Sequence, residues 1–148
     1  MGASVNIEIL TRKSKKKAAI TWLASWLVKD MGLDRYNAEC SIILTKESDQ
    51  LGACHQILPG VYSIVLNSNK PLAQTMQTLC HEFVHLKQFL TGKLRYSEEN
   101  PGKMVWCGMD FCPKKTDYYS QPWEIQAFER ENLLFRRATA ALIKSQKD

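Results

Sequence analysis

Two of the three histidines in this chain lie four positions apart, in the segment HEFVH at residues 81–85. On an α-helix these positions share one face, so His81 and His85 would present two imidazoles one turn apart, which suits tetrahedral zinc. Glu82 is rotated away from the pair by one position. It would therefore take a proton from a water molecule at the open position of the metal, rather than bind the metal itself. The pattern predicts a hydrolytic metal site.

The alternative is an ordinary amphipathic helix on which the two histidines share no role. Leucine and phenylalanine recur every three or four residues on one side of this segment. The polar residues on the opposite side are Thr78, His81, His85 and Gln88. Histidines that served only packing would be mixed into the apolar stripe, so the separation of the two sides favours the metal site.

A catalytic zinc site needs a third protein ligand, and the one remaining histidine, His55, precedes the motif. A carboxylate must then supply it. Glu124, in QPWEIQAFERE, heads an apolar stripe of the last predicted helix, where a carboxylate is costly unless it is paired or bound to a metal. Glu131 lies two turns deeper on the same side and is the second choice. Glu129 points elsewhere and is expected to be solvated or paired with a nearby arginine.

Two further features are candidates for such a site. A tyrosine in the segment before Pro122, either Tyr118 or Tyr119, could donate a hydrogen bond to the oxyanion that forms as water attacks a carbonyl. Tyr119 is the preferred candidate, and a surface or core tyrosine is the alternative. The strand predicted at residues 61–67 could be an edge strand to which an extended peptide adds.

Apolar spacing and turn residues predict the elements that position these side chains. A helix is expected over about residues 15–31, with Ser14 as its N-cap and Gly32 as its stop. Short segments rich in β-branched residues predict three strands of a meander or hairpin set, at residues 40–47, 53–58 and 61–67. The turn between the last two is Pro59-Gly60.

The motif helix is predicted from Pro71 to about Leu90, with a stop at Gly92. Residues 93–121 are expected to be mostly irregular, with one strand at 103–111, and a loop of this length favours a cleft wall. A last helix opens at Pro122 and runs almost to the C-terminus. Its predicted apolar side consists of Ile125, Phe128, Leu134, Phe135, Ala138 and Leu142.

Length and composition predict a folded single domain over residues 1–148, since 45% of the residues are hydrophobic and 24% are charged. The longest apolar stretch, Ala18–Val28, is too short to span a bilayer, so no membrane association is expected. Five cysteines without a CxxC pair predict reduced thiols and a cytoplasmic location. Cys107 and Cys112 are interpreted as strand or turn thiols rather than a zinc knuckle.

The net charge of +5 is concentrated near the two ends of the chain. Such runs are typical of solvated helix ends. They could also contact an acidic partner, and the basic N-terminal helix leaves nucleic acid as a further candidate partner.

The pairing of HEFVHLKQ with PWEIQAFE resembles the zincin-like metallopeptidases of the glutamate-ligand branch. It is most similar to small HExxH proteins encoded by tailed phages and some bacteria, which carry an HE-x-VH-x-KQ helix, a tryptophan-glycine strand and a PWE-x-x-A helix. The resemblance covers roughly residues 60–135 and is weaker to SprT-like proteases, which use a third histidine. It implies zinc bound by His81, His85 and Glu124, with Glu82 as the base.

One position departs from that resemblance. In thermolysin-like enzymes an aspartate four residues after the ligand glutamate supports the first histidine, and here that residue is Phe128. A backbone carbonyl, Glu131 or Gln126 would have to replace it. The expectation is an α+β zincin-like domain with a small, mostly antiparallel sheet, an N-terminal helix, the motif helix and a long C-terminal helix.

The expected function is hydrolysis of peptide bonds in a peptide or protein substrate. The alternatives are a non-catalytic zinc-containing module that binds DNA or a phage or host protein, and a non-proteolytic zinc hydrolase.

Overall fold

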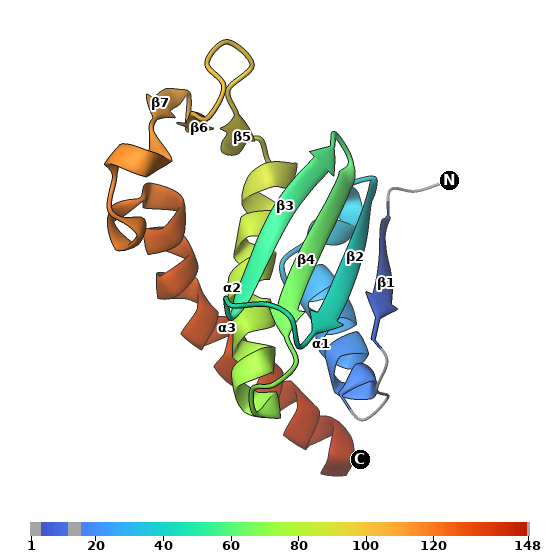
Figure 1. Cartoon of the computed structure of the whole chain (residues 1–148). Coiled ribbons are helices and arrows are strands. Elements are labelled where there is room, and N and C mark those ends of the chain that lie inside the picture. The colour runs from blue at the N-terminus through green and yellow to red at the C-terminus, as the bar shows by residue number, and fades with distance from the viewer. Residues whose placement is uncertain (1–3, 12–15, 148) are drawn as a thin grey trace.

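A four-stranded mixed sheet forms the frame against which the helices pack (Figure 1). The computed structural model of the chain describes residues 4–11 and 16–147. Its strands are β1 (Val5–Leu10), β2 (Ala38–Thr45), β3 (Gly52–Leu58) and β4 (Val61–Asn67), in the spatial order β1-β2-β4-β3. The first two pairs are parallel and β3 runs antiparallel to β4. The predicted cap Ser14 and the neighbouring basic residues 12–15 lie outside the described residues.

The prediction of a mostly antiparallel sheet is wrong for this sheet. Helix α1 (Lys17–Asp30) connects β1 to β2, and such a crossover makes the two strands parallel. β1 was not predicted, although Val5, Ile7 and Ile9 alternate with more exposed residues along it.

The predicted meander is also wrong in its order, because β4 lies between β2 and β3. Strand β4, residues 61–67, is therefore central, and β3 is the edge strand. β3 and β4 are joined by the predicted Pro59-Gly60 turn, in which Gly60 adopts φ 85°.

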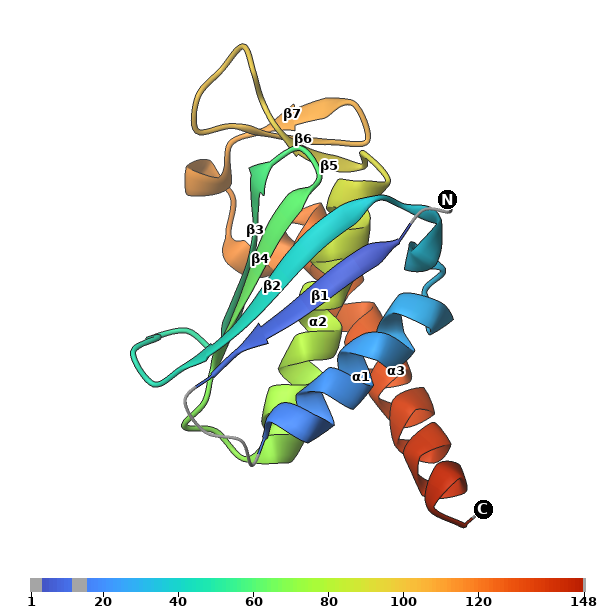
Figure 2. The ribbon, with the colours of Figure 1, turned by 90° about the vertical axis from the view of Figure 1, so that its right-hand side faces the viewer.

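The three long helices lie on one side of the sheet (Figure 2). α1 and α2 (Leu72–Leu90) pack on the sheet, and α3 (Pro122–Lys147) packs mainly along α2. The core between the sheet and the helices includes the fully buried Ile42, Ile64, Leu79, Phe83 and Leu86. Because α2 lies between the sheet and α3, its polar side is buried too.

The helices follow the predictions closely at their ends. Left-handed glycines follow α1 and α2, with φ 68° at Gly32 and φ 78° at Gly92. The predicted apolar side of α3 is partly wrong, since Ile125 and Phe128 are 43% and 39% exposed. The side that α3 buries consists instead of Trp123, Glu124, Ala127, Leu134 and Ala138.

Residues 93–121 contain more structure than expected. Strands β5 (Leu94–Tyr96), β6 (Met104–Trp106) and β7 (Met109–Phe111) form a small antiparallel sheet, followed by the short 3-10 helices η2 (Pro113–Lys115) and η3 (Tyr118–Ser120). The segment predicted as one strand is a hairpin, because Cys107 and Gly108 both adopt positive φ, as a tight type I′ turn requires. Phe111 packs edge-on against Trp123, with ring centroids 5.9 Å apart, and so attaches this sheet to the start of α3.

All five cysteines are free thiols. No helix in the described part of the chain is long and apolar enough to cross a membrane.

Gly52 allows the edge strand to approach α2. A Cβ atom at this position would lie 2.6 Å from Thr78 Cγ2 and 3.1 Å from Glu82 Oε2. We therefore expect Gly52→Ala to lower the free energy of unfolding by about 1–3 kcal/mol, measured by urea denaturation. Thr78→Ser removes the Cγ2 methyl group, so the double variant should recover a substantial part of that loss. Equal stabilities of the single and double variants would contradict this contact.

Candidate metal centre

Helices α2 and α3 bring three metal-binding side chains together. His81 Nε2 lies 2.9 Å from Glu124 Oε1, and His85 Nε2 lies 3.0 Å from the same oxygen. All three residues are buried, and their ligand atoms lie within 4.8 Å of one another. The group could hold a metal ion, and it is the one group of this kind among residues 4–11 and 16–147. The structure thus brings Glu124 to the two histidines across the α2–α3 interface.

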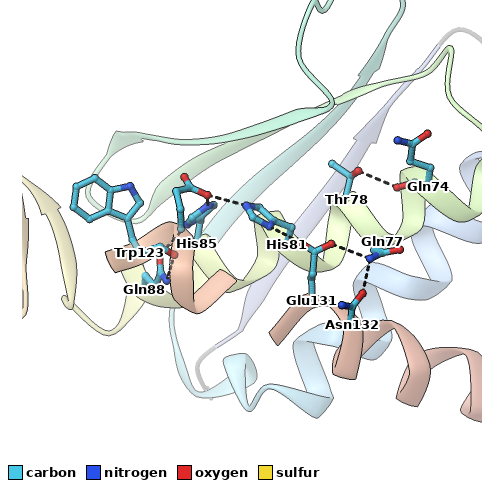
Figure 3. A network of polar contacts seen from close by, with 10 residues as sticks. Gln74, Gln77, Thr78, His81, His85, Gln88, Trp123, Glu131 and Asn132 are labelled. Carbon is cyan, nitrogen blue, oxygen red and sulfur yellow. Dashed lines mark hydrogen bonds and ion pairs between the residues drawn. The ribbon is translucent and has the colours of Figure 1, made fainter. Parts of the chain in front are cut away.

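The His81 Nδ1 atom, the ring nitrogen that does not face Glu124, is hydrogen bonded to a carboxylate (Figure 3). Its Nδ1 lies 2.9 Å from Glu131 Oε1, and Gln77 donates to the other Glu131 oxygen over 3.0 Å. An ionised carboxylate can only accept hydrogen bonds, so Nδ1 carries the proton and donates it. Nε2 is then the nitrogen that faces Glu124. Of the candidates to support His81, the structure therefore places Glu131 against the ring, three residues beyond Phe128.

The His85 Nδ1 atom, the ring nitrogen that does not face Glu124, is hydrogen bonded to Gln88. Gln88 Nε2 donates to the backbone carbonyl of Trp123 and to Gln126 Oε1, both over 3.0 Å. These two bonds fix the amide so that Oε1 faces His85 Nδ1, 2.8 Å away. His85 therefore also donates from Nδ1 to Gln88 (Figure 3). Its Nε2 faces Glu124.

The Glu124 carboxylate lies at nearly the separation from each histidine that a tetrahedral ion requires. Zinc bonds of about 2.0–2.1 Å place neighbouring ligand atoms roughly 3.3 Å apart. The two separations from Glu124 Oε1 are 2.9 and 3.0 Å, so the side chains would need to part by a few tenths of an ångström. Two imidazoles and a carboxylate suit zinc and several other divalent metals, so the donor set alone does not identify the ion.

The charges of the three ligands depend strongly on one another. Burial disfavours the imidazolium of His81, but hydrogen bonds with Glu124 and Glu131 outweigh it and raise the pKa to about 9. Burial likewise disfavours the Glu124 carboxylate, yet its bonds with His81 and His85 lower its pKa to about 2. The His85 pKa is raised as well, by Glu124 against its own burial. In the metal-free protein, these contacts would favour a proton between the histidines and Glu124.

Glu82 lies beside this group without bonding to it. The residue is buried, and burial is the main reason that its pKa rises to about 7, with Glu124 and Glu131 adding to the rise. The two histidines act in the opposite direction. A carboxyl group that titrates near neutral pH can both accept and return a proton under physiological conditions.

Two cavities meet at Glu82. One of about 250 Å³ lies on the His85 side, and its apolar wall consists of Phe89, Leu94, Tyr96, Met104 and Trp123. The other, of about 320 Å³, lies on the His81 side and is bounded by Leu51, Thr78, Tyr119, Phe128 and Glu131. Gln50, Gly52, Glu82 and Tyr118 line both. The start of edge strand β3 therefore borders both cavities.

Tyr118 is the tyrosine that lies closest to the ligand group. Burial and the nearby Glu124 carboxylate raise the Tyr118 pKa above its usual range. Tyr119, the candidate preferred from the sequence, is 69% exposed and packs on Tyr118 and Phe128, with ring centroids 5.2 and 5.4 Å away. Its place is the wall of the second cavity. His55 is exposed on β3.

Sequence reasoning missed the roles of Gln88 and Gly52. Gln88 was assigned only to the polar side of the helix, although its position three residues after His85 places it within reach of that ring. The sequence around Gly52 gave no indication of its role. That role depends on the packing of β3 against α2, which is distant in the sequence.

The contact between Glu131 and His81 predicts a measurable effect on metal affinity. Glu131→Ala should weaken zinc binding about 10–100-fold, because the ring loses the partner that fixes its orientation. Glu129→Ala is the matched control on the same helix, since Glu129 is exposed and no part of the group. Competition with a chromophoric chelator measures both affinities. Equal affinities in the two variants would contradict the role of Glu131.

The raised histidine pKa values predict that metal binding releases protons. A metal needs the unprotonated Nε2 of His81, whose pKa is about 9 in the metal-free protein. The apparent affinity should therefore rise about tenfold per pH unit for each displaced proton as the pH approaches 9, and then level off. Calorimetry in buffers of different ionisation enthalpy counts the protons. No release at pH 7 would contradict the ion-paired metal-free state.

No family model, no curated protein and no solved structure matches this chain. The resemblance to zincin-like peptidases therefore depends on the motif residues of the sequence alone.

Proposed function

We propose that this protein is a zincin-like, zinc-dependent metallopeptidase in which His81, His85 and Glu124 hold the metal and Glu82 is the general base. One observation carries the proposal. A buried carboxyl group with a pKa of about 7 lies beside a buried His₂Glu group, at the junction of two cavities. The raised pKa, the His₂Glu group or the cavities could each arise from packing alone. Their combination is typical of hydrolytic metal sites.

The roles of the metal and of Glu82 in this proposed reaction follow from the positions of the side chains. Zinc supplies Lewis-acid activation, which lowers the pKa of a water molecule and polarises a carbonyl group. Glu82 takes one proton as the water oxygen bonds to the peptide carbon. It returns that proton to the amide nitrogen as the carbon–nitrogen bond breaks, so water is added across the bond without a further reactant.

Tyr118 is the proposed oxyanion donor. It borders both cavities, as Glu82 does, and lies close enough to Glu124 for that carboxylate to raise its pKa. Its raised pKa keeps the hydroxyl protonated over the physiological range. A donor fixed at this point would stabilise the negative charge that develops on the carbonyl oxygen.

The free edge of β3 supports a peptide as the substrate. β3 is the outermost strand of its sheet and borders both cavities at Gly52. An extended chain could add to this edge through backbone hydrogen bonds and place side chains in the cavities on either side of Glu82. Cavities flanking the reaction site on both sides suit a polymer that continues in both directions.

Replacing the base separates catalysis from metal binding. Glu82→Gln should retain zinc, because Glu82 is not a ligand, and should lower the hydrolysis rate by at least about 100-fold. Glu129→Gln is the matched control on the exposed side of α3. Metal content is measured by mass spectrometry, and cleavage is measured with a broad peptide library.

Two outcomes would contradict the proposal. One is a Glu82→Gln variant that holds zinc and cleaves as fast as the wild type. The other is zinc-loaded wild-type protein that cleaves no peptide, which would favour a non-catalytic zinc module.

A further inference from the structure

A third cavity lies behind the metal group, on the opposite side of Gln88. It has a volume of about 180 Å³ and is lined by Met31, Val84, Lys87, Gln88, Thr91, Lys93, Gln126 and Arg130. Three of these residues are cations, contributed by α2, by the connection from α2 to β5 and by α3. None of the lining residues is an acid. We call this cavity the cation pocket.

The positive charges in the cation pocket repel one another. Partial burial is the main reason that the Lys87 pKa is lowered, and the charges of Arg130, Lys93 and Arg35 lower it further. Asp30 acts in the opposite direction, but its carboxylate pairs with Arg137. The fold therefore holds like charges together around a concavity without a carboxylate among them. A bound anion would remove this repulsion.

The end of α2 offers a simpler explanation for only part of this cluster. Cations near a helix C-terminus are favourable because they oppose the negative end of the helix dipole, and this accounts for Lys87 and for Lys93 just beyond the helix. Arg130 lies within α3, well before its end at Lys147, so the same effect does not place it there. Arg130 is exposed and lines the same cavity, so the helix dipole does not account for its place beside Lys87.

We propose that the cation pocket binds a phosphate group, either free or as a phosphomonoester. A guanidinium group and two ammonium groups that converge from separate elements match the several oxygens of one phosphate. Gln126 accepts a bond from Gln88 through Oε1, which leaves its own amide nitrogen as a neutral donor for the anion. A small concavity suits a compact anion better than the extended backbone of a duplex.

The cation pocket is connected to the candidate metal group through a single side chain, that of Gln88. Gln88 forms part of the pocket wall, and its Oε1 accepts a hydrogen bond from His85 Nδ1 over 2.8 Å. A phosphate in the pocket would therefore lie one side chain away from a metal ligand. The proposed site does not depend on the proposed hydrolysis, and because phosphate can also bind zinc, it is tested on metal-free protein.

The experiment titrates the full chain, treated with chelator, with inorganic phosphate and with phenyl phosphate at constant ionic strength. Two-dimensional NMR follows the amide resonances around residues 87–93 and 126–130. We expect saturable one-to-one binding with a Kd of about 1 mM or tighter. The double variant Lys87→Gln/Arg130→Gln should weaken it at least tenfold. Arg136→Gln/Lys144→Gln removes the same charge from exposed positions of α3 and should leave the affinity unchanged.

The two ligands distinguish the source of the phosphate. Tighter binding of phenyl phosphate would assign a phosphomonoester, and tighter binding of inorganic phosphate would assign the free anion. Failure to saturate, or equal weakening by both double variants, would overturn the site. So would binding of duplex DNA at these residues that phosphate does not displace, because it would indicate a general basic surface.

Discussion

The contact between the polar side of α2 and the first turns of α3 is the constraint on which the candidate site depends. It removes two histidines and two glutamates, His81, His85, Glu82 and Glu124, almost completely from water. Burial of such groups is costly unless each finds a partner. Among the described residues, no fully buried side-chain nitrogen or oxygen lacks a hydrogen bond, and His81, His85 and Glu124 bond to one another. These bonds hold His81, His85 and Glu124 in an arrangement that could receive a metal ion.

The segment between the helices positions α3 over α2. The small β5–β7 sheet contacts the first turn of α3 through Phe111 and Trp123, and the Trp123 carbonyl fixes the Gln88 amide that orients His85. Gln121 then donates to the carbonyls of Pro113 and Thr116, which closes the loop that carries Tyr118. A region that looks irregular in sequence thus determines where the third ligand and the cavity wall lie.

The sequence was sufficient for the helices and for the three residues of the buried His₂Glu group, because their signals are local. The spacing of His81 and His85, and the cost of placing Glu124 on a buried face, can be assessed from one helix at a time. The sheet order was not predictable in this way, since the exchange of β3 and β4 depends on how non-adjacent strands pair. For the same reason the sequence placed peptide addition on residues 61–67, which form the central strand β4, rather than on the edge strand β3.

Of the two residues that bond to the histidine Nδ1 atoms, one could be predicted from a single helix and the other could not. Glu131 was among the candidates to support His81, because the periodicity of α3 places it below Glu124 on the same side. Gln88 was not, although it lies on the motif helix itself, because its role depends on the Trp123 carbonyl that fixes its amide. The exposed faces of Ile125 and Phe128 arise because α3 packs mainly on α2 and leaves that side of the helix uncovered.

The central claim is that the Nε2 atoms of His81 and His85 and the Glu124 carboxylate form a metal site. The most direct measurement is a crystal structure of the zinc-treated protein with anomalous diffraction recorded on both sides of the zinc absorption edge. One strong anomalous peak is expected between α2 and α3, about 2.0–2.2 Å from these three ligand atoms, with both Nδ1 atoms still bonded to Glu131 and Gln88. Absence of a peak there, or zinc bound instead by cysteine thiolates, would contradict it.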